Sequence, residues 1–319
     1  SNTTGLHNTS VGFQSLKTNT TGQQNTAVGQ DSLFANTTGS YNTAVGKNAL
    51  VNNTTASYNT AFGDRALHAN TTGVSNVGIG HYALHATTTG GANTAIGTNA
   101  LDLNTTGSSN TVVGYEALTT GTTAEQNVAI GRSSLISCTT GDYNTAVGRS
   151  SASSMTSGNE NVALGYFAGN QSEVIQLTTQ TNRIAMGSKS ITNAYIKVAW
   201  TVTSDQRDKA DITDFTHGLD YINELRPVNY VWDERSNYAD GISDGSKKKD
   251  LPQLGFLAQE IEAVETSLGI TNNCVVDKEN PEHLKVTETK LIPILVNAIK
   301  ELSTQNAALA ARLTTLEEG

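Results

Sequence analysis

The sequence predicts a mainly β protein: a β-solenoid or β-roll of 17-residue repeats, then a small α+β domain that ends in a coiled-coil helix. Glycine recurs at an unbroken 17-residue step through the first half, the period lapses after Gly169, and an apolar heptad begins at Ile292. A fixed period of this length means that each unit buries its apolar face only against its neighbours. The recurrent glycines are Gly12, Gly29, Gly46, Gly63, Gly80, Gly97, Gly114, Gly131, Gly148 and Gly165.

Composition and charge restrict the classes of partner. The chain has 319 residues, enough for two domains, and its net charge of −9 falls entirely after residue 200. A neutral rod and an acidic second region argue against nucleic acid, which requires a basic footprint. The sequence lacks an apolar run long enough for a membrane span, so we expect no membrane insertion. Cys138 and Cys274 suggest no disulfide framework.

Each repeat has a conserved internal order around its glycine, taken here as position 0. Position −4 is Asn, position −2 is almost always small, position −1 is branched or aromatic, and position +4 is Leu in the first eight units. A Thr-Thr-Gly corner precedes the Asn, and Ala56 and Ala124 twice replace its glycine. We expect a short strand, a corner, a second short strand and another corner. Because strand residues alternate sides, we expect positions −3 and −1 to fill the interior and the small residue to face outward.

The glycine and the asparagine of the repeat each have a structural interpretation. The glycine supplies a backbone angle that a Cβ would penalise, whereas the Thr-Thr-Gly corner accepts Ala and is less strained. The asparagines either form a ladder of amide hydrogen bonds along the rod or act as simple turn residues. These asparagines are Asn8, Asn25, Asn42, Asn59, Asn76, Asn93, Asn110, Asn127, Asn144 and Asn161. The Asn-Thr-Thr triplets at Asn19, Asn36 and Asn70 fit the glycosylation sequon, but we interpret them as a by-product of the repeat.

The elements after the repeats are predicted from apolar patterning. A last imperfect unit at 182–187 closes the rod, and alternation over 196–202 predicts a strand. A helix is expected over 215–225, stopped by Pro227, then a strand over 228–232 and a polar loop over about 240–250.

The C-terminal region carries nearly four heptads. Its a and d positions are Ile292, Leu295, Ile299, Leu302, Asn306, Leu309, Leu313 and Leu316. Ile at a and Leu at d, with one Asn at a, favour two strands on propensity alone. A helix packed on its own domain is the alternative to a coiled coil.

The repeats resemble the Asn-x-Ala-x-Gly units in the heads of trimeric bacterial surface adhesins, and similar arrays in phage and bacterial fibre proteins. The resemblance covers about residues 1–170 and implies a homotrimer. We therefore expect three strands in the coiled coil as well, because the rest of the molecule can override the preference of a short helix.

Four motifs after residue 203 occur in a fixed order. They are Ser-Asp-x-Arg-x-Lys, Gly-Leu-Asp-Tyr-Ile-Asn-x-Leu-Arg-Pro, Gly-Phe-Leu-Ala-Gln-Glu and Leu-Ile-Pro-Ile-Leu-Val-x-Ala-Ile-Lys-Glu-Leu. In this order they resemble the C-terminal intramolecular chaperone domain of phage tail fibres and tailspikes, of the endosialidase type. The resemblance implies a domain that helps the fibre to trimerise and then cuts itself off. The expected boundaries are a shaft at 1–187, a linker strand and cleavage junction at 188–203, and the chaperone at 204–319, with a coiled coil at about 288–317.

The resemblance places the chemistry at the first motif. It implies Ser204 as nucleophile and Lys209 as general base, with cleavage between Thr203 and Ser204; cleavage one bond later stays open. A lysine desolvated by burial is neutral enough to activate a serine hydroxyl. The alternative is that Ser-Asp is an ordinary helix N-cap. Asp205 and Arg207 are expected to be structural or orienting, and we expect no cofactor and no metal.

The sequence thus predicts a phage tail fibre or tailspike that attaches to a host surface, with a single self-cleavage as its enzymatic activity. Its partners would be two further copies of the chain and a host receptor, a glycan or an outer-surface protein, and its place would be the virion. A bacterial trimeric adhesin with the same chaperone, on the cell surface, is the alternative. A polysaccharide-degrading tailspike is a third candidate, but glycan hydrolysis needs paired carboxylates, and those of the repeats are scattered singly.

Overall fold

The computed structural model of this chain divides into two compact units, Ser1–Tyr195 and Ile196–Gly319, which are described separately below. It describes residues 2–318 except 172–174, 189, 192–193, 196, 198–201 and 272–273. The strand predicted over 196–202 therefore lies mostly outside the described residues.

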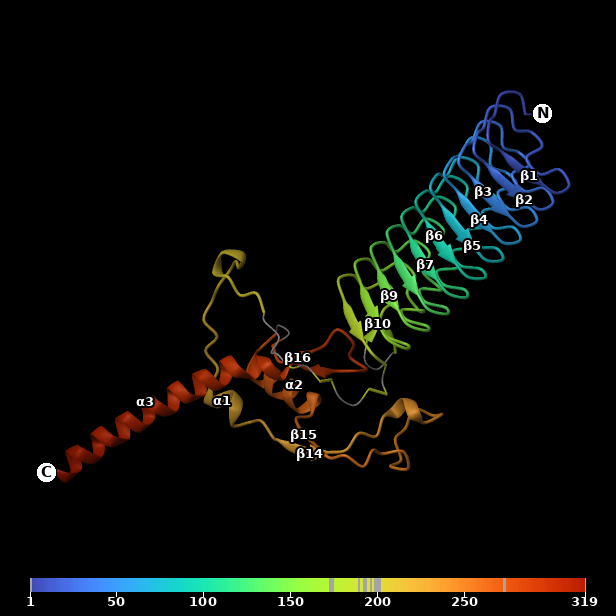
Figure 1. Ribbon diagram of the computed structural model, residues 1–319. Coiled ribbons are helices and arrows are strands. Elements are labelled where there is room, and N and C mark those ends of the chain that lie inside the picture. The colour runs from blue at the N-terminus through green and yellow to red at the C-terminus, as the bar shows by residue number, and fades with distance from the viewer. Residues whose placement is uncertain are drawn as a thin grey trace. The chain divides into compact units, whose positions relative to one another are not determined.

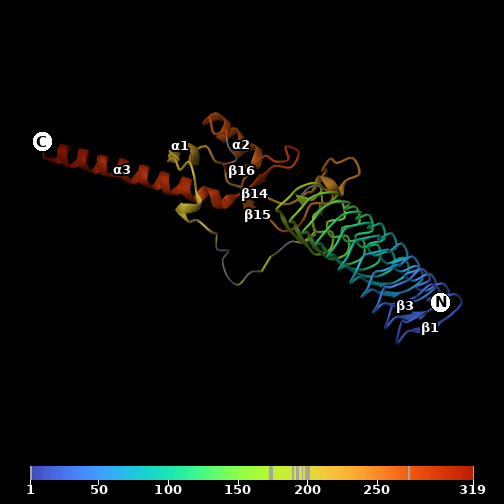
Figure 2. The same ribbon diagram turned by 90° about the horizontal axis from the view of Figure 1, so that it is seen from above.

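The first unit is a solenoid in which eleven parallel strands form one sheet. The strands stack side by side along the unit (Figures 1 and 2). Equivalent residues of successive coils pair, as in Ala27 with Ala44, so the register follows the 17-residue period. The strands are β1 (Thr9–Val11), β2 (Thr26–Val28), β3 (Thr43–Val45), β4 (Thr60–Phe62), β5 (Val77–Ile79), β6 (Thr94–Ile96), β7 (Thr111–Val113), β8 (Val128–Ile130), β9 (Thr145–Val147), β10 (Val162–Leu164) and β13 (Ile184–Met186).

The last imperfect repeat does close the solenoid, as predicted. Strand β13 pairs in parallel with β10, Val162 lying opposite Ile184. Between them, β11 (Asn170–Gln171) and β12 (Ile175–Gln176) form a small antiparallel pair. The residues added to this coil thus form their own hairpin, and the stack resumes in register after it.

The prediction of a second strand in each coil is wrong. Described coils have one three-residue strand, and the segment after the glycine is a continuous run of turns. Residues at positions +2 and +4 lie in the left-handed region; in the fifth coil Tyr82 has φ 59° and Leu84 has φ 54°. Left-handed residues at alternate positions cannot form an extended strand. A single sequence does not show that a leucine adopts this conformation.

The predicted inward and outward faces of the strand are also reversed. The small middle residue is fully buried, as in Ala27 and Ala95, whereas the flanking residues are partly or fully exposed. Leucine at position +4 fills the interior: a Cβ at Gly78 would lie 3.3 Å from Leu67 Cγ. Leucine occupies most of the interior, so the strand contributes a small side chain in nearly every coil; the buried Val112 of β7 is the exception among the described coils.

The glycine at position 0 is required for two reasons, the first of which was predicted. Gly97 has φ +137°, a conformation that side chains disfavour. A Cβ there would lie 2.5 Å from the carbonyl oxygen of Gly114 in the next coil. The glycine therefore permits both the turn and the close stacking of coils. The Thr-Thr-Gly corner has no left-handed φ at Gly39, in keeping with the alanine at position 56.

The asparagine ladder is confirmed. Asn93 is fully buried, and its Oδ1 accepts hydrogen bonds from the backbone N–H and the Nδ2 of Asn110, both at 3.0 Å. Its own Nδ2 donates to the carbonyl of Gly107 at 2.9 Å. The same pattern joins successive coils along the unit, so each asparagine satisfies buried backbone groups of two corners.

A second ladder, absent from the sequence analysis, uses the asparagines of the Asn-Thr-Thr triplets. Asn36 Nδ2 donates to Asn19 Oδ1, and Asn53 Nδ2 donates to Asn36 Oδ1, both at 2.8 Å. These side chains are fully buried, which is why the triplets recur and why they do not serve as glycosylation sites in the folded shaft. The signal was visible as a second asparagine at the 17-residue step.

Cys138 takes the place of an asparagine in this second ladder. The burial of its thiol predicts a low reactivity, which can be measured. Burial raises its pKa to about 11, and its Sγ contacts the carbonyl of Gly141 at 3.7 Å. At pH 8 only about one thiol in a thousand is ionised. We expect Ellman's reagent to modify Cys274, which is partly exposed, at least a hundredfold faster than Cys138 in folded protein. Equal rates in folded protein, with Cys274→Ser as the control, would contradict this.

The described part of the second unit contains short helices, two small antiparallel pairs of strands and one long helix. Its pairs are β14 with β15 and β16 with β17. The elements are η1 (Gln206–Asp208), α1 (Leu219–Ile222), β14 (Val228–Tyr230), η2 (Arg235–Asn237), β15 (Gln253–Gly255), α2 (Ala258–Ser267), β16 (Val276–Asp277), β17 (Lys285–Val286), η3 (Glu288–Lys290) and α3 (Leu291–Glu317). The helix predicted over 215–225 forms only in its centre, and the strand over 228–232 and the loop over 240–250 are observed, the strand two residues shorter.

The core of the second unit surrounds a buried carboxylate. Glu265 on α2 is fully buried; its Oε1 accepts the backbone N–H groups of Val275 and Val276 and the Tyr221 hydroxyl at 2.6, 3.3 and 3.3 Å. Lys278 Nζ lies 3.8 Å from Oε2. Burial raises the pKa of Tyr221 well above its ordinary value. The hydroxyl therefore stays protonated and donates to Glu265. One side chain thus ties α1, α2 and the segment before β16 together.

Removing this carboxylate should weaken the second unit. In Glu265→Ala, two buried N–H groups and the Tyr221 hydroxyl lose their acceptor, so we expect a loss of about 2 to 4 kcal/mol in the free energy of unfolding. Glu265→Gln keeps an acceptor oxygen and should lose less. Amide hydrogen exchange at Val275 and Val276 measures the effect locally, and unchanged protection in Glu265→Ala would refute this role.

The C-terminal helix is confirmed, and its two faces differ. Leu291, Ile294 and Ala298 are buried in the second unit. The a and d residues are instead exposed on the single chain, as in Ile299 at 64 %. The first turns of the helix thus pack on the domain, which was the alternative, whereas the coiled coil stays a prediction for the exposed heptad seam.

Candidate self-cleavage site

The first motif brings Ser204 and Lys209 into direct contact. Lys209 Nζ donates a hydrogen bond to Ser204 Oγ at 2.6 Å. The two residues flank the 3₁₀ turn η1, in which Asp208 N–H donates to the Asp205 carbonyl and Lys209 N–H donates to that of Gln206. This single turn reverses the chain, so residues five apart in sequence lie side by side.

Asp205 and Arg207 hold the turn, as expected from the sequence. Asp205, rather than Ser204, is the N-cap: its carboxylate accepts the Arg207 backbone N–H at 2.9 Å. The Arg207 guanidinium also pairs with this carboxylate at 2.6 Å, and its hydrogen bonds lower the pKa of Asp205. Because Asp205 makes the cap, the Ser204 hydroxyl is left for its contact with Lys209.

The surroundings of the pair differ from the expectation of a buried lysine. Thr203, Ser204 and Lys209 are exposed on the single chain. An exposed ammonium group keeps its hydration, which opposes the neutral form that a general base needs. The single chain thus has the geometry for proton transfer between Ser204 and Lys209, without the desolvation.

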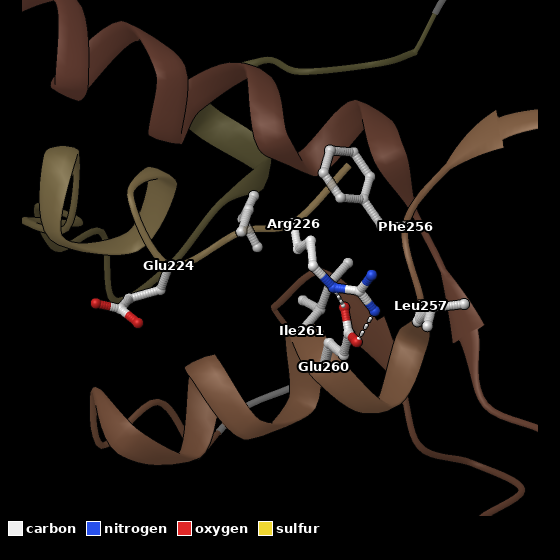
Figure 3. A pocket seen from close by; sticks show the side chains of 7 residues that line it. Glu224, Arg226, Phe256, Leu257, Glu260 and Ile261 are labelled. Carbon is white, nitrogen blue, oxygen red and sulfur yellow. Dashed lines mark hydrogen bonds and ion pairs between the residues drawn. The ribbon is translucent and has the colours of Figure 1, made fainter. Parts of the chain in front are cut away.

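The second and third motifs meet at a small pocket in the second unit. Strands β14 and β15 pair so that Val228 lies opposite Gly255. The Arg226 guanidinium faces the Glu260 carboxylate, with Nε donating to Oε2 at 3.1 Å, beside the ring of Phe256 (Figure 3). These contacts hold α2 against the segment after α1.

The second motif also packs on the fourth, through residues that the sequence analysis did not single out. Asn297 Nδ2 on α3 donates to the Phe215 carbonyl at 2.6 Å, and Glu301 accepts the backbone N–H of Leu219 at 3.0 Å. A Cβ at Gly218 would lie 2.7 Å from the Ala298 nitrogen, so only glycine fits there. The second motif thus contacts both α2 and α3.

The described residues contain no group of three His, Cys, Asp or Glu side chains arranged to hold a metal ion. Among the helices described, none combines the length and the apolar character needed to cross a bilayer.

Comparison with protein families matches residues 204–270 to the family described as chaperone of endosialidase, a peptidase family. The match begins at Ser204 and covers the first three motifs; the fourth lies beyond its end. Comparison with curated proteins and with solved structures returned no match. The match over residues 204–270 and the parallel β-solenoid together fit a tail-fibre-like protein with a C-terminal chaperone domain.

Proposed function

We propose that the solenoid is the shaft of a trimeric fibre, and that the C-terminal domain assembles this shaft and then releases itself by cleavage between Thr203 and Ser204. The observation that carries the proposal is the 2.6 Å contact of Lys209 Nζ with Ser204 Oγ at the first residue of the matched segment. Nucleophilic cleavage of a peptide bond by serine requires at least a base in contact with the hydroxyl.

The proposed chemistry needs only this chain and water. Neutral Lys209 takes the proton of Ser204 Oγ, which attacks the carbonyl carbon of Thr203. The peptide C–N bond breaks, the nitrogen leaves as the protonated α-amine of Ser204, and an ester joins Thr203 to Oγ. Water then hydrolyses the ester, which yields a carboxylate at Thr203 and restores the hydroxyl. The reaction happens once per chain.

The exposure of Lys209 links cleavage to assembly in this proposal. On the single chain Lys209 is exposed to water and lacks the desolvation that activates a lysine as a base, so the single chain would be inactive. Neighbouring chains that cover the pair would desolvate Lys209 and make it a base. Cleavage would then follow trimer formation, and an unassembled chain would keep its chaperone.

Two exposed apolar surfaces support a trimer. The first, here called the strand face, is the column of position −1 side chains, which are branched or aromatic in strands β1 to β10; Phe62 is 56 % and Ile96 is 38 % exposed. The second is the heptad seam of α3. A continuous apolar stripe along a rod, and a second along a helix, are surfaces that proteins bury in assemblies.

Charge on the strand face should separate the chains. We expect the double substitution Ile79→Asp/Ile96→Asp to convert the trimer to monomer, because it places six carboxylates in an apolar interface. Leu103→Asp, at an exposed leucine outside the strand face, should remain trimeric. Light scattering after gel filtration measures the mass. A trimer in the double variant would exclude the strand face as the interface.

Host attachment and a virion location complete the proposal. An elongated, neutral shaft that needs its own assembly domain suits a fibre that reaches a surface, and its receptor would be a glycan or an outer-surface protein. Antibodies against the shaft should label purified virions and block adsorption. Labelling of a bacterial surface instead would support the alternative, a trimeric adhesin with the same chaperone.

A further inference from the structure

Four consecutive coils of the shaft carry a column of aromatic and cationic side chains directly after the position-0 glycine. They are Tyr115, Arg132, Arg149 and Tyr166, here called the Tyr-Arg ladder. All four side chains are exposed. Elsewhere in this column the shaft has no two adjacent cations. The ladder is therefore a local departure from a neutral repeat.

The backbone of the ladder is rigidly spaced. Ser133 N–H donates to the Tyr115 carbonyl, Ser150 N–H to the Arg132 carbonyl and Phe167 N–H to the Arg149 carbonyl, at 2.9, 2.8 and 3.0 Å. Successive members are thus one coil apart, about 4.8 Å. The ladder forms an ordered strip along the shaft and needs no folding on binding.

The two arginines turn away from each other. Arg132 lies over the Tyr115 ring at 5.5 Å and Arg149 lies over the Tyr166 ring at 5.7 Å. Cation–π packing of this kind holds a guanidinium group but leaves its N–H donors free for hydrogen bonds. Within the described part of the chain, neither group has an ion-pair partner. Glu116, which follows Tyr115 in the sequence, is hydrogen-bonded to the Tyr115 hydroxyl, and this bond raises the pKa of Tyr115.

We propose that the Tyr-Arg ladder binds an acidic saccharide, with Arg132 and Arg149, each held over its tyrosine ring, donating to carboxylates of the sugar. Two like charges on neighbouring coils repel, and bound anions relieve the repulsion. The flanking tyrosine rings extend the strip over about three coil spacings, the length of a short oligosaccharide. Nucleic acid is disfavoured, because the shaft has a net charge near zero and the ladder supplies only two cations.

The proposal deepens the attachment role and rests on it for its biological purpose. A trimer would carry three ladders, so weak binding at each site would combine into strong attachment to a surface polysaccharide. Binding of an acidic saccharide would also explain why an otherwise neutral rod carries a local basic strip.

Binding of an oligogalacturonate to the assembled trimer, measured by calorimetry, tests the proposal. We expect the wild-type protein to bind it, to bind a neutral maltooligosaccharide of matched length at least tenfold more weakly, and to lose affinity with added salt. Arg132→Gln/Arg149→Gln should reduce the affinity for oligogalacturonate at least tenfold, and Tyr166→Ala severalfold. Lys47→Gln removes one cation from the same column without an arginine or tyrosine neighbour and should leave affinity unchanged.

Three results would overturn the proposal: no binding of oligogalacturonate, equal binding by the double arginine variant, or an equal loss in Lys47→Gln. Adsorption to host cells separates this inference from the attachment role. A double arginine variant that adsorbs like wild type leaves attachment intact and refutes the ladder. A wild-type trimer that binds oligogalacturonate but no cell refutes attachment and leaves the ladder as a saccharide site.

Discussion

Ser204→Ala and Lys209→Ala should each leave the full-length chain uncut, whereas the wild-type chain separates into two fragments on a denaturing gel. Cleavage between Thr203 and Ser204 would divide the chain into residues 1–203 and 204–319. The two side chains are in contact at 2.6 Å, so removal of either takes away the nucleophile or its base. We expect the cleavage rate to fall at least about a thousandfold, as for other nucleophile–base pairs.

Matched controls separate catalysis from folding. Ser246→Ala and Lys248→Ala remove the same side chains from an exposed loop of the second unit and should cleave normally. Ser204→Ala should still form trimers, which gel filtration measures. The mass of the C-terminal fragment identifies the bond, since cleavage one bond later would start it at Asp205. A wild-type chain that trimerises and stays uncut would contradict the self-cleavage proposal, and so would a Ser204→Ala trimer that is cut.

Loss of one asparagine from the first ladder should destabilise the whole shaft. In Asn93→Ala, the backbone N–H of Asn110 loses its acceptor, and the carbonyl of Gly107 keeps only its hydrogen bond from Asn104 Nδ2. An unsatisfied buried polar group costs about 1 to 3 kcal/mol and each further lost hydrogen bond about 1 kcal/mol, so we expect a loss of about 2 to 4 kcal/mol per chain. Chemical denaturation of the shaft, followed by circular dichroism, measures it.

Two comparisons test the cause of this loss. Asn52→Ala, at an exposed asparagine of the same shaft, should change stability by less than about 0.5 kcal/mol. Asn93→Asp should be destabilised at pH 7, where a buried carboxylate faces the Gly107 carbonyl, and should recover as the pH falls, because the protonated acid can donate to that carbonyl. A shaft in which Asn93→Ala unfolds like Asn52→Ala would show that the ladder adds nothing to stability.

The sequence was most informative where a residue satisfies a local rule. The glycine step predicted the stacked coils. At Gly97, for example, the backbone has a positive φ and the carbonyl of the next coil lies too close for a side chain. The recurrence of asparagine predicted a ladder once coils are stacked in register. The order of the four motifs predicted a chaperone domain, and the family comparison matches the segment that contains three of them.

The errors arose where packing, and not local pattern, decides. Alternation along Thr-Ala-Val sorts the side chains into two faces but does not say which one is inside. The leucine at position +4, as in Leu67, occupies the interior, so the buried middle residue of the strand is small in nearly every coil. The prediction of a second strand failed because Leu84 and its equivalents adopt a left-handed φ that only the stacking of coils can stabilise. The second asparagine ladder was hidden by its resemblance to a glycosylation signal.

At the candidate site, local and global contributions separate in the same way. The spacing of Ser204 and Lys209 determines their contact, because one 3₁₀ turn held by Asp205 and Arg207 brings residues five apart together. A single chain leaves Lys209 exposed, and its burial in the proposed mechanism would require neighbouring chains.

The sequence alone thus determined the period, the corner residues, the existence of a separate C-terminal domain and the residues of the Ser204–Lys209 pair, since each depends on interactions within one repeat or one turn. The tertiary structure decided which face of the strand is buried, where the second ladder runs and that Arg132 and Arg149 share a column with two tyrosines. These features depend on which residues of different coils are stacked, and the stacking exists only after the chain has folded.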